Sequence, residues 1–485
     1  MEEENKIREI RHKETKVWHA LITFGLLMLV MAVCIIHFKV DPHVPMFIGV
    51  IIASVMALCL GYKWKEIEES MMDGIYRALQ AVVILIIIGI LIGVWIVGGI
   101  VPSMIYYGLK LLSPGIFLVA AVLICSITSL ATGTSWGTMG TMGLALMGIA
   151  VGLGIPAPAA AGAIISGAYF GDKMSPLSDT TNLAPAMAGT DVFTHIKFMM
   201  VPTIITYGIS LVVFGVLSHH YVTSGVADTS AVQEISNGLK DMFLIHPLLL
   251  LPPVIVITAV VLKVPAIPGI TLGILSGAVI GMIAQGSDCT FGDVMACGMS
   301  GFESHSGIKA VDSLLTSGGI MNMMSSVALT IIAMMFGGIM EKTKQLEVLV
   351  GKLMMLVKKP GGLVTVTEAT CVLSNITMPE QYISLVVPGR MYAQAYKDRG
   401  LHPKTLSNAL ESAGTVTSVL VPWNTCGVFI KSTLKISTGA YWPFAVFNYL
   451  MPEVTILMAY LRYTVADKAG KRLGFKKSFF TKNTK

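Results

Sequence analysis

The chain has 485 residues, of which 54% are hydrophobic and only 13% are charged. An average soluble domain carries about 25% charged residues, and a soluble chain this long needs more polar surface to cover its core. The composition therefore excludes an ordinary soluble enzyme, a disordered protein and a nucleic-acid-binding protein, and the net charge of +6 is expected to report orientation in a membrane.

Apolar runs predict membrane-spanning helices along the whole chain. A helix of about 20 apolar residues spans a bilayer, and the alternating pattern of a membrane β-barrel is missing. No small-residue cleavage pattern follows the first run, which is too long for the core of a signal peptide, so we expect it to be retained. The predicted spans lie near residues 17–38, 44–62, 78–100, 195–218, 246–262, 320–340 and 441–461.

The central part of the first half predicts a hairpin followed by a broken helix. Residues 111–171 contain no Asp, Glu, Lys, Arg or His. Within them, 113–151 is expected to begin and end on one side of the membrane, as two helices or as a re-entrant hairpin whose tip lies at 132–138. A long crossing containing Pro176 follows at 157–187.

The chain resembles itself at an offset of 246 residues. Cys125 aligns with Cys371, and the triplet 176–178 aligns with 422–424, each beginning with Pro. Further matches at the same offset involve Gly, Pro and aromatic positions. This predicts two homologous halves, and places the counterpart of the first hairpin tip at 375–381.

Basic residues lie at opposite ends of the matched segments. Loop 98–113 has one Lys or Arg and its counterpart 341–361 has five, whereas 61–77 has three and its counterpart 286–319 has one. Since Lys and Arg favour the cytoplasmic side, the halves are expected to insert with opposite topology. Inverted halves with broken helices near mid-membrane are typical of secondary transporters.

The predicted fold is therefore an all-α polytopic membrane protein made of two inverted-topology repeats. Each repeat has about five transmembrane helices plus a re-entrant hairpin, with helices broken at mid-membrane. The predicted segments are a cytoplasmic N-terminal segment (1–16), a first repeat (17–218), an extracytoplasmic linker (219–245), a second repeat (246–463) and a basic cytoplasmic tail (464–485).

Polar residues inside the apolar segments mark a candidate site. Asp172 and Asp179 are seven residues apart and would share one face of a helix, while Pro176 between them would free the carbonyl near Asp172. Hydroxyl, carbonyl and carboxylate oxygens suit a hard cation, and carboxylates inside a membrane are functional candidates by default. The alternative is a loop at the membrane edge in which Asp172 pairs with Lys173.

The matching segment of the second half contains Glu411, which is the only charged residue between Lys404 and Lys431. The alternative interpretation is a Glu at a helix end, with neighbouring hydroxyls bonded to the backbone. His195 is expected at a membrane edge rather than in a proton relay. Cys289 and Cys297 share one loop, in which a disulfide is the less favoured alternative, and their spacing matches no zinc pattern.

Other functional classes are disfavoured by missing motifs. The sequence has no G-x-x-x-x-G-K-[ST] phosphate loop and no H-E-x-x-H motif, which argues against a built-in ATP motor and against an intramembrane zinc protease. A passive channel is less favoured than alternating access, since two non-identical inverted halves do not form a repeated filter. We expect no cofactor and no catalytic residues.

Three segments, 133–140, 167–185 and 421–427, resemble the NhaC-type sodium/proton antiporter family. The resemblance extends over nearly the whole chain. It implies exchange of Na⁺ for H⁺ across the bacterial plasma membrane by a protein embedded in the lipid bilayer, and a homodimer. Some members are similar to malate/lactate exchangers that also move Na⁺ and H⁺. The positions of the basic residues place both termini on the cytoplasmic side. The chain departs from the family pattern at Ser412, where an Asp is expected, and at 378–381.

The resemblance and the residues together give a hypothesis for transport. Asp179, with Asp172 nearby, would bind either Na⁺ or H⁺ but not both, and Ser178 and Thr180 would complete the Na⁺ site. The alternative is an organic-anion exchanger whose substrate carboxylates bind helix N-termini at the hairpin tips. The candidate ion- or substrate-binding residues are Thr134, Ser135, Asp172, Ser178, Asp179, Thr180, Asn182, Glu411, Thr415, Asn424 and Thr425, with Asn375, Glu380 and Gln381 as a second tier.

Overall fold

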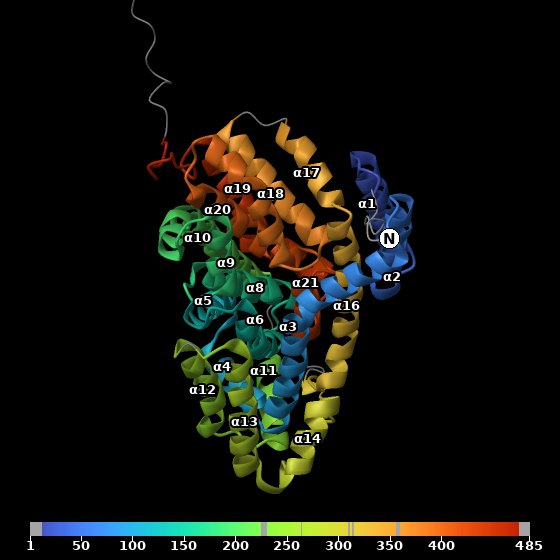
Figure 1. The fold of residues 1–485 in the computed structure, drawn as a ribbon. Helices are drawn as coiled ribbons and strands as arrows, with labels where there is room; N and C mark the ends of the chain where they lie inside the picture. Colours follow the sequence, from blue (N-terminus) through green and yellow to red (C-terminus); the bar gives the residue numbers. More distant parts are fainter. Residues whose placement is uncertain are drawn as a thin grey trace, which may run out of the picture.

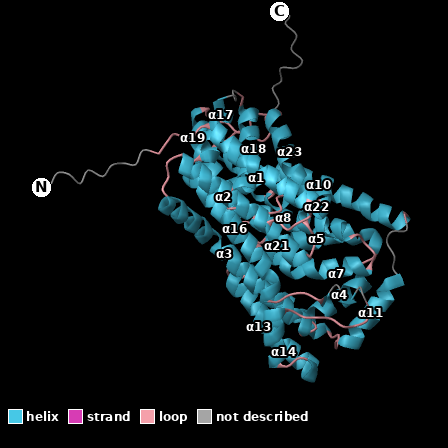
Figure 2. Cartoon of the chain, turned by 90° about the vertical axis from the view of Figure 1, so that its right-hand side faces the viewer, coloured by secondary structure: helices cyan, strands magenta, loops and turns pink. Residues whose placement is uncertain are grey.

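The computed structural model describes residues 12–224, 230–262, 264–308, 311–312, 315–355 and 359–474. The described chain is a tall bundle of helices (Figure 1). Figure 2 shows helices and loops without a strand in this part of the chain, where the only β-type pairings are three isolated bridges. Six of the described helices are long and apolar enough to cross a membrane, or up to eight if each of two bent helix pairs is one span. The prediction of an all-α, multi-pass membrane protein is confirmed.

The first half of the chain contains the helices up to α10. These are α1 (Val17–Ala32), η1 (Val33–His37), α2 (His43–Cys59), α3 (Trp64–Val97), α4 (Ile100–Leu111), α5 (Pro114–Thr132), α6 (Ser135–Thr138), η2 (Met139–Gly143), α7 (Leu144–Gly152), α8 (Ala157–Met174), α9 (Asp179–Ala188) and α10 (Val192–Thr223).

A connecting region and the second half follow. They consist of α11 (Ser230–Met242), η3 (Pro247–Leu250), α12 (Leu251–Val261), α13 (Ala266–Gln285), η4 (Gly286–Asp288), α14 (Phe291–Ser300), α16 (Ile320–Lys342), α17 (Gln345–Met355), α18 (Pro360–Thr377), α19 (Ile383–Asp398), α20 (Pro403–Leu410), η5 (Glu411–Thr415), η6 (Ser418–Leu420), α21 (Thr425–Leu434), α22 (Thr438–Tyr441), η7 (Trp442–Phe444) and α23 (Val446–Tyr460).

The run predicted as one span near 441–461 is divided into α22, η7 and α23, and two further predicted spans also differ from the observed helices. Helix α3 begins at Trp64 rather than near residue 78, because the amphipathic turns before the apolar run bury Ile67, Met71 and Gly74. The span predicted over 246–262 belongs to a pair of helical segments bent by 99° at the break before Pro247. Apolar runs alone miss both features, because the first depends on packing and the second on a break.

Helices α3 and α16 lie side by side along the tall dimension of the molecule (Figure 1). Glycines let their backbones approach closely: a Cβ on Gly74 would lie 2.1 Å from the carbonyl oxygen of Met334, and one on Gly338 would lie 2.0 Å from that of Ser70. Small residues at such crossings are typical of helix packing in membranes. Arg77 of α3 and Glu341 of α16 form an ion pair beside this contact.

Helix boundaries recur at the sequence offset of 246. Adding 246 to the bounds of α8 gives 403–420, which are the outer bounds of α20 with η5 and η6. Adding it to α9 gives 425–434, which are the bounds of α21. Each half therefore has a helix broken at the same matched position, and the opposite orientation of the halves stays a prediction.

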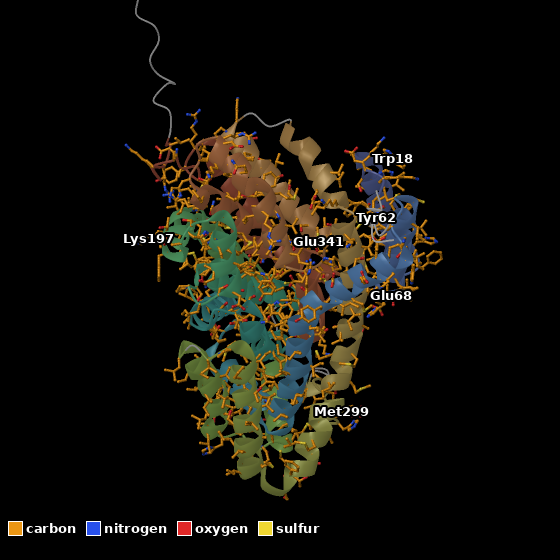
Figure 3. All side chains as sticks on the ribbon, viewed as in Figure 1. Trp18, Tyr62, Glu68, Lys197, Met299 and Glu341 are labelled. Carbon is orange, nitrogen blue, oxygen red and sulfur yellow. The ribbon has the colours of Figure 1, made fainter. Side chains whose placement is uncertain are left out.

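The outer surface carries many exposed apolar side chains. Trp18 on α1 and Met299 on α14 project from the bundle, while Lys197 lies on the opposite side of the view from Trp18 (Figure 3). Trp18 is 53% exposed and Val212 of α10 is 65% exposed. A multi-pass membrane protein is expected to present such a surface to lipid. All seven cysteines are free, including Cys289 and Cys297.

Candidate ion-binding site

The segment that joins α8 to α9 breaks the helix at the predicted place. Helix α8 ends at Met174, and α9 begins at Asp179 after Ser178, whose hydroxyl accepts a hydrogen bond from the backbone N–H of Thr181 at 3.4 Å. Asp172 and Asp179 therefore lie on two separate helices, and the prediction that they share one helix face is wrong. The prediction of a free carbonyl is also wrong, because the Asp172 carbonyl accepts the Thr181 hydroxyl at 3.1 Å.

The tip of the first hairpin packs against this break. Gly133 ends α5 with a φ of +67°, and a Cβ there would lie 2.7 Å from the backbone of Leu177, so a glycine satisfies both the backbone angle and the close approach. Thr134 then caps α6 by accepting a hydrogen bond from the N–H of Gly137 at 3.2 Å. The Gly- and Thr-rich tip is thus built to meet the broken helix.

A cavity of about 210 Å³ lies where the break, the first hairpin tip and residues 380–382 meet. Among the described residues that line it, three carry carboxyl groups, Asp172, Asp179 and Glu380, and none is Lys or Arg. Oxygen-rich walls with net negative charge suit a cation. The other lining residues are Gln80, Ala81, Ile84, Thr132, Gly133, Thr134, Ser135, Trp136, Gly137, Leu177, Ser178, Thr180, Val264, Pro265, Ile270, Gln381 and Tyr382.

The two Asp side chains differ in their surroundings. Asp172 is buried, and its Oδ2 accepts hydrogen bonds from the Ser135 hydroxyl at 2.7 Å and from the Ser135 backbone N–H at 3.2 Å. Asp179 is exposed and accepts a hydrogen bond from the Tyr382 hydroxyl at 3.4 Å. Asp172 is thus the carboxylate held in place at the closed side of the cavity, and Asp179 is more open to solvent.

The second hairpin supplies the third carboxylate. Glu380 is buried, and its Oε2 accepts hydrogen bonds from the backbone N–H groups of Tyr382 at 2.6 Å and Ile383 at 3.1 Å. A carboxylate at the N-terminus of α19 is stabilised by the free N–H groups and the helix dipole. Beside it, the side-chain Oε1 of Gln381 accepts a hydrogen bond from the Cys426 thiol at 3.0 Å.

The structure gathers eight of the predicted residues at the cavity and leaves six elsewhere. Those at the cavity are Thr134, Ser135, Asp172, Ser178, Asp179, Thr180, Glu380 and Gln381. The others are Asn182, Glu411, Thr415, Asn375, Asn424 and Thr425, none of which lines it. Asn182 is exposed and donates hydrogen bonds to the carbonyls of Pro176 and Ser178, so it holds the break together.

The Asn residues of the second half join its broken helix to the second hairpin. Asn424 caps α21 and donates a hydrogen bond to the Asn375 side-chain oxygen at 3.2 Å. Asn375 in turn donates to the Gly414 carbonyl at 2.8 Å and to the Thr417 hydroxyl at 3.1 Å. This network fixes the geometry of the second half behind the cavity wall. Thr415 and Thr425 are buried in the same region.

Buried charged residues lie behind the cavity, and two of them, Lys173 and Glu368, were not among the predicted site residues. Lys173 is fully buried and donates a hydrogen bond to the Ser412 hydroxyl at 3.2 Å, so the alternative in which it pairs with Asp172 in an edge loop is wrong. Glu411 and Glu368 are also buried near Lys173. Glu368 is the only charged residue between Lys359 and Glu380. A single charge in such a stretch could have marked it as a candidate from the sequence.

The side chain of His195 is fully buried, and its Nδ1 lies 2.9 Å from the Ser407 hydroxyl. It is buried because α20 covers the start of α10, and its place at a membrane edge stays a prediction. Lys197, two residues further on, is at the periphery of the molecule (Figure 3).

Replacing Ser135 with Ala tests the contact that holds Asp172. The substitution removes the 2.7 Å hydrogen bond to the carboxylate, and hydrogen bonds to charged groups contribute about 1.5–3 kcal/mol. We expect the Na⁺ concentration for half-maximal exchange to rise about tenfold, measured in vesicles. The matched control is Ser129→Ala, which removes a 2.6 Å hydrogen bond to the neutral Ala168 carbonyl and should leave that concentration unchanged. Equal effects of both substitutions would contradict the role given to Ser135.

Known antiporters resemble this chain over nearly its full length. The chain is 36% identical over 452 residues to the Na⁺/H⁺ antiporter NhaC of Alkalihalophilus pseudofirmus, covering 93% of this chain and 96% of that protein. It is 36% identical over 444 residues to the malate-2H⁺/Na⁺-lactate antiporter of Bacillus subtilis, covering 92% and 94%. It is 34% identical over 450 residues to the arginine/ornithine antiporter ArcD of Halobacterium salinarum, covering 92% of each.

The model of the Na⁺/H⁺ antiporter family matches residues 167–462. The match begins in α8, just before the broken segment that lines the cavity, and continues through the second half to the end of α23. Together with the full-length relatives, this match shows that the chain belongs to the Na⁺/H⁺ antiporter family.

Proposed function

We propose that this protein is a secondary transporter that exchanges Na⁺ for H⁺ across the plasma membrane of a bacterium. The observation that carries the proposal is the cavity between the two hairpins, whose described lining includes three carboxyl groups and no Lys or Arg. A wall of this kind attracts cations, and its hydroxyl and carboxylate oxygens are the ligands that Na⁺ prefers. Two relatives with full-length similarity are named for Na⁺ and H⁺ antiport.

Exchange follows if Na⁺ and H⁺ compete for the same carboxylates. Asp179, with the hydroxyls of Ser178 and Thr180, would bind Na⁺ at the open side of the cavity, and Asp172 would bind it at the closed side. A proton that neutralises these groups removes the charge that attracts Na⁺. The cavity then opens to the opposite side of the membrane with either Na⁺ or H⁺ bound, but not both.

Alternating exposure would come from the two halves. We propose that residues 17–218 and 246–463 are inverted repeats, joined by an extracytoplasmic linker at 219–245, and that residues 1–16 and 464–485 lie on the cytoplasmic side. The broken helices α8–α9 and α20–α21 meet the hairpins at the centre of the bundle, and rocking of one half against the other would open the cavity to each side in turn. We also propose, as the family resemblance implies, that the protein lies in a lipid bilayer and forms a homodimer.

Purified protein in liposomes with a trapped pH dye tests the proposal. Addition of Na⁺ outside is expected to make the interior alkaline, because each Na⁺ that enters is exchanged for outgoing H⁺. Li⁺, malate, lactate, arginine and ornithine are added in separate arms. An interior pH that responds only when an organic ion is present would contradict Na⁺/H⁺ exchange.

Asp179→Asn is expected to abolish most Na⁺-driven pH change in the same vesicles. The substitution keeps the size of the side chain but removes the charge that faces the cavity. Asp293→Asn is the matched control, since Asp293 is a solvent-exposed Asp near the start of α14 and does not line the cavity. Full Na⁺-dependent transport by Asp179→Asn would remove Asp179 from the site.

The second candidate function is exchange of a small organic ion coupled to Na⁺ and H⁺. The observation that favours it is the volume of about 210 Å³, which is far larger than a single dehydrated Na⁺. The relatives named for malate and lactate and for arginine and ornithine handle organic ions. Because none of the described lining residues is Lys or Arg, an organic anion would require Na⁺ or H⁺ to be bound first.

A further inference from the structure

A buried carboxyl group on α18 lies outside the cavity and takes no part in the site described above. Glu368 is 1% exposed, and neither of its carboxylate oxygens has a hydrogen-bond partner within the described chain. The three ion pairs found among the described residues do not include it. Burial strongly disfavours an ionised carboxylate in such surroundings, and it disfavours a protonated carboxyl group much less. Glu368 is therefore placed to hold a proton.

Nearby charges make release of that proton feasible. Lys173 at the end of α8 is fully buried and interacts electrostatically with Glu368 and with Glu411. A positive charge close to a carboxyl group stabilises the form that has lost its proton. The other titratable groups that face this cluster are Cys371 on α18, Tyr392 and Tyr396 on α19, Asp172 on α8 and His195 on α10.

The cluster is connected to the cavity by two routes. Along the backbone, Asp172 faces the cavity and Lys173, the next residue, faces Ser412 in the second half. Across the interface, the Thr180 hydroxyl lines the cavity and donates a hydrogen bond to Glu411 at 3.3 Å. A cation bound in the cavity therefore adds positive charge close to Lys173 and Glu411, which weakens proton binding at Glu368.

We propose that Glu368 is a second proton-binding site, which releases its proton when Na⁺ occupies the cavity and takes one up when Na⁺ leaves. Such coupling is reciprocal, so a proton on Glu368 also weakens Na⁺ binding. The site raises by one the number of protons exchanged for each Na⁺. This inference rests on the proposed Na⁺/H⁺ exchange and adds a group from the second half of the chain to it.

Glu368→Gln tests the inference in liposomes, because Gln keeps the shape of the side chain but cannot give up a proton. The pH gradient that balances an imposed Na⁺ gradient gives the number of H⁺ per Na⁺, and isotopic Na⁺/Na⁺ exchange reports transport that needs no proton. The matched control is Glu453→Gln, an exposed carboxylate on α23, which packs against α18. Glu368→Asp retains a carboxyl group and serves as the conservative variant.

We expect Glu368→Gln to exchange one proton fewer per Na⁺ while its Na⁺/Na⁺ exchange stays within about twofold of wild type. Glu453→Gln and Glu368→Asp should keep the wild-type ratio. An unchanged ratio in Glu368→Gln, or loss of Na⁺/Na⁺ exchange together with Na⁺/H⁺ exchange, would overturn the role of Glu368. If the wild-type protein itself shows no Na⁺/H⁺ exchange, the proposed function fails, and that result is distinct from either outcome for the variant.

Discussion

Asp172→Asn is expected to reduce the apparent affinity for Na⁺ by about 100-fold or more, which corresponds to about 2.8 kcal/mol. Asp172 is the buried carboxylate of the cavity, and Ser135 fixes its orientation through two hydrogen bonds. Asn has nearly the same shape and still accepts these bonds, so the loss reports the missing charge. The measurement is the Na⁺ dependence of the pH change in liposomes.

Asp191→Asn is the control for this substitution. Asp191 is an Asp at the N-cap of α10, where its side chain accepts a hydrogen bond from the N–H of Thr194 at 2.9 Å. Asn is an equally good N-cap residue, so the folded structure and the Na⁺ dependence should both be retained. If Asp172→Asn shows wild-type Na⁺ dependence, the cavity does not bind Na⁺ through its buried carboxylate.

Gly171→Leu is expected to disrupt the folded protein and its transport together. Gly171 of α8 packs against α5, where an added Cβ would lie 2.5 Å from the Ser126 carbonyl oxygen and 2.6 Å from the Leu130 backbone nitrogen. Backbone atoms cannot rotate away, so the helices must separate, and overpacking of this kind costs about 1–3 kcal/mol or more. The shift would also move Asp172, the next residue, out of the cavity.

Gly208→Leu provides the matched comparison, because a Cβ on Gly208 of α10 meets no atom within 4 Å. Leu is a better helix former than Gly by about 1 kcal/mol, so this variant should be at least as stable as wild type. Thermal unfolding in detergent and Na⁺-driven exchange are the two measurements. Equal stability of the two Leu variants would show that close α5–α8 packing is not required.

Much of the fold is predictable because apolar runs and breaks are local features of the sequence. Uncharged runs predicted most of the spans, and Pro176 marked the break between α8 and α9. The Gly- and Thr-rich run predicted a hairpin tip at 132–138, and the structure places Gly133 of this tip against Leu177. These features depend on neighbouring residues and on the need to satisfy the backbone in lipid.

The composition of the site was less predictable because it depends on contacts between distant segments. Asp172 and Asp179 both line the cavity, yet they do so across a helix break rather than along one helix face. Glu411, predicted as a site residue, lies behind the wall with Lys173 instead of in the cavity. Sequence spacing assigns faces only within a continuous helix, so a break between residues removes that information.

The most direct test of the central claim is proton release on Na⁺ binding. Purified protein in a weakly buffered detergent solution is mixed with Na⁺, and a pH dye records the protons that leave. Competition for the cavity predicts saturable acidification by the wild-type protein and little or none by the double variant Asp172→Asn/Asp179→Asn. Saturable Na⁺ binding without proton release, or unchanged release by the double variant, would contradict the account.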